Sequence, residues 1–197
     1  VSNNNIFDYF SAGSASAGMN INSFSSGWTI TGNNFYQTAT RTSTVSNQHS
    51  GIFISNAGTG YTISNNSIGG STTGAGGTAW TIAGAFTNRF VGISVSAAST
   101  ATTSIQGNTI ANFAVNTTSS ATTSNGNFSG IWVSGGNANI GTTTGNIIGS
   151  GTGTGSITVT LQTNTGGNAN MISYSGAGTA DIRNNTIGSI NLVGTTT

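Results

Sequence analysis

The sequence predicts an all-β solenoid, a parallel β-helix of about six coils with three short strands per coil and variable inserts on one corner. Two repeated features carry this prediction. The first is an Asn-Asn or Gly-Asn pair that recurs along the chain, and the second is a short block with the pattern Gly-Ile-x-Ile/Val-Ser. Because repeats of this period build solenoids, residues 1–197 are expected to form one β-helix segment of a longer repeat array.

The asparagine pair recurs at intervals of 30 to 42 residues, and an apolar side chain follows two residues later. The second asparagine of each pair is expected at the same turn of successive coils, where its amide can bond to the next coil. The predicted ladder contains Asn34, Asn66, Asn108, Asn146 and Asn185. The same row could instead be a polar binding surface, but buried turn amides need hydrogen-bond partners, which favours the ladder.

Each repeat contains short runs with apolar residues at alternate positions, which is the period of a strand and not of a helix. Gly and Asn between the runs are typical of turns. The expected inward residues are Ile52, Ile54, Ile63 and Ile68, then Ile93, Val95, Ile105 and Ile110, then Ile131, Val133, Ile140 and Ile148, and finally Ile172, Tyr174, Ile182 and Ile187. The inserts at 78–82 and 156–161 are also strand-like, and they are expected to form a side sheet or a hairpin packed on the solenoid.

Charged residues are almost absent, with three Lys+Arg, two Asp+Glu and one His. The net charge of +1 provides no basic face, so nucleic acid is not an expected partner. Because no run of about 18 apolar residues occurs, membrane insertion is not expected either. The hydrophobic share of 34%, with nine Phe and three Trp, argues against a disordered chain.

Reactive side chains are few and are expected to lie apart. The only carboxylates, Asp8 and Asp181, should be near opposite ends of the solenoid, too far apart for paired acid–base chemistry. His49 has no neighbouring acid or second ligand and is expected to be a solvated loop residue. Asp181 and Arg183 should form a weak surface ion pair. The sequence therefore predicts no catalytic, cofactor-binding or metal-binding residue, and a protein that is not an enzyme.

Two aromatic residues, Phe53 and Trp132, occupy the outward position between inward residues. They are the candidate surface contacts, because outward aromatics can stack on sugars. The equivalent positions in other repeats hold Asn20, Ser94 and Ser173, so the aromatic row is interrupted, and cover by an insert is the favoured alternative. Regular rows of threonine on a flat face would indicate an ice-binding solenoid. The threonine runs here, such as 142–144, do not recur at the repeat spacing, so ice binding is only the third hypothesis for the function.

The segment Gly51-Ile52-Phe53-Ile54, followed by Tyr61-Thr62-Ile63-Ser64-Asn65-Asn66-Ser67-Ile68, resembles the parallel β-helix repeat of pectate-lyase-like proteins. This resemblance covers most of the chain and implies a right-handed helix. Lyases of that fold carry an acidic calcium cluster and a basic catalytic residue, and no position here matches either, so the resemblance does not imply lyase activity.

The near-chargeless repeats, including residues 145–150 and 184–189, are similar to giant repeat proteins on the surface of gram-negative bacteria. Many of those are adhesins, including substrates of type IX secretion and gliding-motility adhesins. The resemblance implies an extracellular, non-enzymatic passenger segment of a surface adhesin that attaches to surfaces or glycans. Its expected partners are neighbouring repeats of the same polypeptide, secretion machinery, and glycans or abiotic surfaces. The alternative is a carbohydrate-binding or polysaccharide-processing β-helix whose active residues lie outside this segment.

Overall fold

The structure is a computed structural model that describes residues 1–23, 25–163 and 166–194. Its strands form four parallel sheets, which we number I to IV in the order in which the chain enters them from β2 onward. Sheet I contains β2 (Ala17–Ile21), β6 (Gln48–Ser55), β10 (Arg89–Ser96), β14 (Phe128–Gly135) and β18 (Ala169–Tyr174). Sheet II contains β3 (Thr29–Thr31), β7 (Thr62–Ser64), β11 (Thr103–Gln106), β15 (Ala138–Ile140) and β19 (Ala180–Ile182).

The other two sheets complete the enclosure. Sheet III contains β1 (Asn5–Phe7), β4 (Asn34–Tyr36), β8 (Ser67–Ile68), β12 (Thr109–Ile110), β16 (Ile147–Gly149) and β20 (Thr186–Gly188). Sheet IV contains β5 (Arg41–Thr42), β9 (Trp80–Ala83), β13 (Phe113–Thr117), β17 (Ile157–Leu161) and β21 (Ile190–Gly194). The described residues include a single short 3₁₀ helix, η1 (Thr73–Ala75), between β8 and β9.

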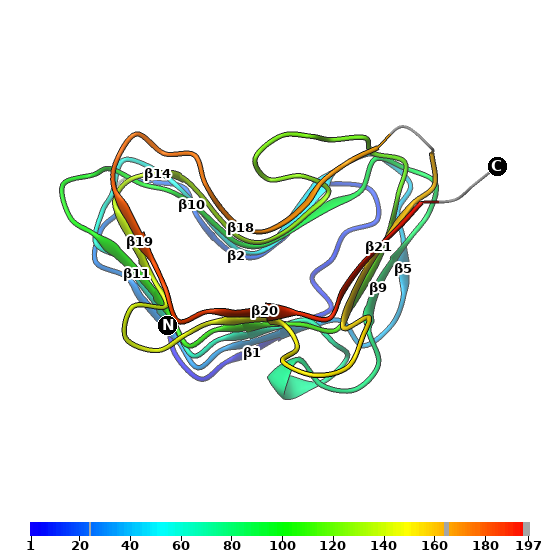
Figure 1. Cartoon of the computed structure of the whole chain (residues 1–197), viewed down its shortest axis with the longest axis horizontal. Helices are drawn as coiled ribbons and strands as arrows, with labels where there is room; N and C mark the ends of the chain where they lie inside the picture. Colours follow the sequence, from blue (N-terminus) through cyan, green and yellow to red (C-terminus); the bar gives the residue numbers. More distant parts are fainter. Residues whose placement is uncertain (24, 164–165, 195–197) are drawn as a thin grey trace.

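From β2 onward, the chain passes through sheets I, II, III and IV in turn. We call each such set of four strands, for example β2 to β5, a rung. Each strand from β2 to β17 pairs in parallel with the strand four places later, as β6 pairs with β10, whereas β1 pairs with β4. Viewed down the short axis of the molecule, the four sheets surround one interior (Figure 1). The arrangement is all-β and compatible with a parallel β-helix.

The prediction of three strands per coil was wrong, because every rung has a fourth strand in what we had interpreted as an insert. Residues 78–82 and 156–161 contribute β9 and β17, which join sheet IV instead of forming a hairpin outside the core. Trp80, Ile82 and Val159 of this sheet are buried in the same core as the isoleucines of the other sheets. Loop length, and not a missing strand, therefore accounts for the irregular repeat spacing.

The predicted isoleucine columns are present in the register of the strands. Ile63 pairs with Ile105, which pairs with Ile140, which pairs with Ile182. The first three are fully buried, and each contributes about 2 kcal/mol by removing apolar surface from water. Ile182 lies at the edge of sheet II and is 44% exposed, because no further strand of the structure covers it.

An aromatic cluster that the sequence analysis did not identify fills the space between sheets I and IV. Phe113 lies at its centre, with ring centroids 5.4 Å from Trp80, 4.6 Å from Phe90 and 5.3 Å from Phe128. All four rings are at most 1% exposed. These residues lie within the inserts or at their ends, outside the repeated isoleucine blocks. The repeat pattern therefore did not predict that they point inward.

A ladder of asparagine side chains runs along the turn between sheets II and III. Its members are Asn4, Asn33, Asn66, Asn108, Asn146 and Asn185, and each Nδ2 from Asn4 to Asn146 donates to the Oδ1 of the next member. The bond from Asn66 to Asn108 is 2.9 Å long. The backbone N–H of Asn66 donates to the same oxygen, so each step of the ladder satisfies a buried backbone donor too.

The placement of Asn34 in the ladder was wrong by one residue. Asn34 lies within β4, where it pairs with Ser67, and its amide bonds to Asn5 outside the ladder. The member of this rung is Asn33, which is fully buried and stands two residues before the inward Phe35, as Asn66 stands before Ile68. Tyr36, which stands two residues after Asn34, is half-buried, and the inward aromatic residue of this rung is Phe35.

Candidate binding pocket on sheet I

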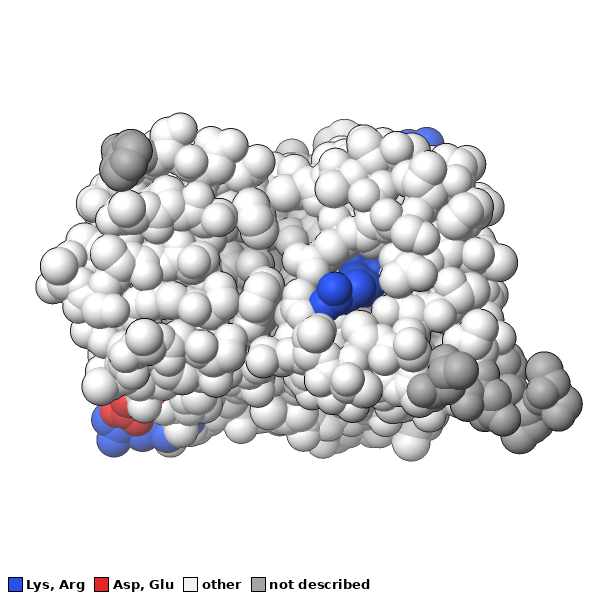
Figure 2. All heavy atoms as spheres, turned by 90° about the horizontal axis from the view of Figure 1, so that it is seen from above, with Lys and Arg blue, Asp and Glu red and all other residues white. Residues whose placement is uncertain are grey.

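Sheet I bends inward halfway along its strands (Figure 1). Within these strands, the register of neighbouring pairs skips Gly51, Gly92 and Gly130. A Cβ atom on Gly92 would lie 2.6 Å from the carbonyl oxygen of Gly130 and 2.9 Å from the Ile110 side chain, so only glycine permits this close packing. The space-filling view onto this face shows a groove across it (Figure 2).

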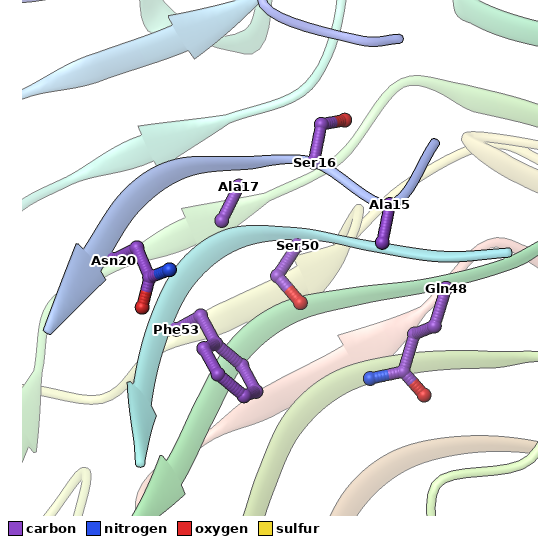
Figure 3. Close-up of a pocket in the computed structure, with 7 residues that line it drawn as sticks. All are labelled: Ala15, Ser16, Ala17, Asn20, Gln48, Ser50 and Phe53. Carbon is purple, nitrogen blue, oxygen red and sulfur yellow. The ribbon is translucent and has the colours of Figure 1, made fainter. Parts of the chain in front are cut away.

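A pocket of about 310 Å³ opens on the outer face of sheet I. Its lining comes from β2, β6 and the residues just before β2: Ala15, Ser16, Ala17, Asn20, Gln48, Ser50 and Phe53. Figure 3 shows the Asn20 amide, the Ser50 hydroxyl and the Gln48 amide nitrogen directed toward the space beside the Phe53 ring. The pocket therefore combines one aromatic surface with three uncharged polar groups that face it, while the fourth polar side chain of the lining, Ser16, contacts the His49 ring at 2.8 Å.

The polar groups of the pocket keep free hydrogen-bonding capacity. Within the described part of the chain, the Asn20 side chain and the Ser50 hydroxyl have no hydrogen-bond partner, although Ser50 is only 4% exposed. The Gln48 side-chain oxygen accepts a 2.8 Å bond from Asn125, which leaves its amide nitrogen available. Because these groups line an open pocket, they are free to bond to a ligand or to water.

A loop between β13 and β14 holds Gln48 in place from two rungs away. The guanidinium of Arg89 in β10 fastens this loop, because its Nε donates to the Gly126 carbonyl (2.8 Å) and its NH2 group donates to Asn125 and to Thr123. Partial burial lowers the pKa of Arg89 from its ordinary value. This arginine is therefore committed to loop structure and is not among the residues that line the pocket.

The two predicted surface residues lie in one row of sheet I. Phe53 pairs with Ser94, which pairs with Trp132, so the two rings are separated by one strand. Both are half-buried, and only Phe53 lines the pocket. The Trp132 Nε1 donates to the Ser175 hydroxyl over 3.2 Å. Asn20, which was not predicted to bind a ligand, pairs with Phe53 and so lies in the same row.

His49 is not the solvated loop residue that we expected. It is 1% exposed, pairs with Phe90 in sheet I, and lies with its ring centroid 3.9 Å from that of Phe10. Its Nδ1 is 2.8 Å from the hydroxyl oxygen of Ser16. Burial lowers the pKa of His49 to about 4, because the charged imidazolium would lose its hydration inside an aromatic environment.

This depressed pKa predicts a loss of stability in mild acid. Between pH 6.5 and about 4 the unfolded chain binds a proton at His49 and the folded chain does not, so acid favours unfolding. The free energy of unfolding should fall by about 3 kcal/mol over this range. Urea unfolding of the wild type and of His49→Phe at pH 7.5 and pH 4 measures it. A variant that loses as much stability as the wild type would contradict this origin.

The two carboxylates are far apart in the strand order and each has its own partner. Asp8 follows β1 and accepts bonds from the Gln37 amide (2.6 Å) and from the backbone and hydroxyl of Thr38 (2.8 and 2.7 Å). Asp181, in the last strand of sheet II, forms the expected ion pair with Arg183 at 2.5 Å. The described residues include no group of three or more His, Cys, Asp or Glu side chains that could hold a metal ion.

The fold and the pocket together define an all-β protein of four parallel sheets with a pocket lined by uncharged residues. Comparisons with models of protein families, with curated proteins and with solved structures found no match to the chain. Among the described residues, no helix is long and apolar enough to cross a membrane.

Proposed function

We propose that this chain is a structural passenger segment of a secreted cell-surface adhesin, built as a right-handed parallel β-helix of about six coils. Its role is to form a stiff rod and to present a face with few charged residues for attachment to surfaces or glycans. Neighbouring repeats of the same polypeptide would extend the rod, and secretion machinery, of type IX or gliding-motility kind, would deliver it.

The observation that carries this proposal is the unbroken asparagine ladder beside four parallel sheets. Each rung is bonded to the next by strand pairing on four sides and by an amide at the turn, as Asn108 bonds to Asn146 over 2.9 Å. A force along the rod must therefore break many bonds together before a rung separates. This is the mechanical property that an attachment protein needs.

The charged residues also support a structural role. Asp8 supports the turn at Thr38, Arg89 fastens a loop, and Asp181 pairs with Arg183. Glycoside hydrolysis requires two carboxyl groups within about 10 Å of each other. Asp8 follows the first strand of sheet III, whereas Asp181 is in the last strand of sheet II. We therefore propose a non-enzymatic function for the segment.

Attachment under flow tests this proposal. Beads coated with the folded chain should adhere to glass, to polystyrene or to polysaccharide-coated slides at higher shear than beads coated with the same chain unfolded in urea and then rinsed. Equal detachment of the two bead types from all surfaces would contradict an adhesive role. Release of reducing sugar from any polysaccharide by the purified chain would contradict the non-enzymatic part and favour the polysaccharide-processing alternative.

A further inference from the structure

We propose that the pocket on sheet I binds one ring of a neutral polysaccharide. Phe53 would contact the apolar face of the sugar, and Asn20, Gln48 and Ser50 would bond to its hydroxyl groups. This inference rests on the proposed function, because it names the ligand class of an attachment surface.

The size and lining of the pocket fit a sugar ring. Its volume of about 310 Å³ is at the lower end of small-molecule sites, which suits a single ring and not a folded peptide. A sugar ring has apolar C–H faces and a rim of hydroxyl groups. The Phe53 ring and the methyl groups of Ala15 and Ala17 offer apolar contact, while the amides and hydroxyls offer polar contact at the edge.

The unpaired polar groups point to a ligand that both donates and accepts hydrogen bonds. The Ser50 hydroxyl lines the pocket and has no partner among the described residues, so it is free to donate to a ligand and to accept from one. Gln48 offers N–H groups because Asn125 already occupies its oxygen. The Asn20 amide offers both a donor and an acceptor. Sugar hydroxyls, which do both, match all three groups.

The lining also predicts that the ligand is neutral. No charged residue lines the pocket, and the guanidinium of Arg89 is already bonded to the loop at Thr123, Asn125 and Gly126. An anionic sugar would therefore lose hydration without gaining an ion pair. A cationic sugar would meet the same cost, since neither Asp8 nor Asp181 lines the pocket.

The row of sheet I predicts the direction of a longer ligand. Phe53 and Trp132 are two strand spacings apart, which is about 10 Å along the stack of strands. An oligosaccharide that leaves the pocket across the strands would pass Ser94 and reach Trp132. Longer oligosaccharides should therefore bind more tightly than a disaccharide, with Trp132 contributing only to the longer ones.

Calorimetric titration with defined oligosaccharides tests the proposal. The probes are hexasaccharides and disaccharides of neutral glucan, mannan and galactan, with hexagalacturonate as the charged comparison. At least one neutral hexasaccharide should bind about tenfold more tightly than hexagalacturonate. Phe53→Ser, which introduces the residue that β10 has at this position, should weaken that binding about tenfold or more. Trp132→Ser should weaken binding of the hexasaccharide and leave that of the disaccharide unchanged.

Phe7→Ser is the matched control, because Phe7 is an exposed aromatic residue of sheet III outside the pocket. The Phe7→Ser variant should bind the neutral hexasaccharide with the same affinity as the wild type. No binding of any neutral hexasaccharide, or equal loss in Phe53→Ser and Phe7→Ser, would overturn the sugar site. If the coated beads still adhered to bare glass or polystyrene in that case, the adhesive function would stand without the sugar site.

Discussion

Replacing Asn108 with alanine is expected to lower the free energy of unfolding by about 4 kcal/mol. The Asn108 oxygen accepts bonds from the N–H and the amide of Asn66, and its own amide donates to the Ile63 carbonyl and to Asn146. Alanine removes all four bonds and leaves their partners buried. Urea denaturation followed by circular dichroism measures the loss.

Asn34→Ala is the control for this prediction, since Asn34 belongs to the same residue type but lies outside the ladder. Its side chain makes bonds to Asn5 and to the backbone of Gly74, both in exposed surroundings. The expected cost is about 1 kcal/mol or less. If Asn34→Ala destabilised the protein as much as Asn108→Ala, the assignment of the ladder to Asn33 and its equivalents would be wrong.

Phe113→Ala is expected to cost about 3 to 5 kcal/mol, because it creates a cavity in the middle of the aromatic cluster. The ring is 1% exposed and contacts Trp80, Phe90 and Phe128, so its neighbours have no room to collapse without moving sheets I and IV. Phe113→Leu, which retains most of the apolar volume, should recover a large part of this loss.

The measurement is again the free energy of unfolding in urea, with Phe7→Ala as the comparison. Phe7 is 51% exposed and stacks on Tyr36 at a centroid distance of 5.2 Å. Its removal should cost about 1 kcal/mol. Equal costs at Phe113 and Phe7 would show that sheet IV does not share the core of the other sheets.

The isoleucine columns could be predicted from the sequence because a period of two residues and a repeated glycine set both face and register. Ile63, Ile105 and Ile140 align because each is the last apolar residue before an asparagine turn. The fourth sheet was harder to predict. Its strands, such as β9 and β13, follow loops of different length, and no common residue marks where they begin.

The ladder shows how a local ambiguity becomes a register error. Asn33 and Asn34 each stand two residues before an aromatic residue, Phe35 and Tyr36 respectively. The pairing of Phe35 with Ile68 in the structure identifies Asn33 as the ladder member. Backbone geometry would have helped, because the residue before a ladder asparagine often has positive φ, as Gly32 (67°), Asn65 (54°) and Gly107 (61°) do. Gly32, which precedes Asn33, has the positive φ of this rule, whereas Asn33, which precedes Asn34, does not.

The pocket could be predicted only in part. Phe53 was placed on the outward face by alternation, but of its polar neighbours Asn20 comes from β2 of the preceding rung, and Gln48 and Ser50 precede the glycine block in β6 itself. Gln48 is oriented by Asn125, which lies 77 residues later, and no spacing within one repeat reveals such a contact. His49 was misplaced for a related reason, since it precedes the glycine block and its pairing with Phe90 depends on a strand that begins earlier than the repeat suggests.

Disulfide trapping between neighbouring rungs tests the stacking of successive rungs most directly, and the chain has no native cysteine. Thr62 and Ser104 are paired in sheet II, so Thr62→Cys with Ser104→Cys should form a disulfide on mild oxidation. Thr62→Cys with Thr102→Cys is out of register by two residues and should remain reduced under the same conditions. Non-reducing electrophoresis after protease digestion distinguishes the two. Cross-linking of the out-of-register pair in place of the paired one would contradict the parallel, in-register stack on which the fold, the ladder and the pocket all depend.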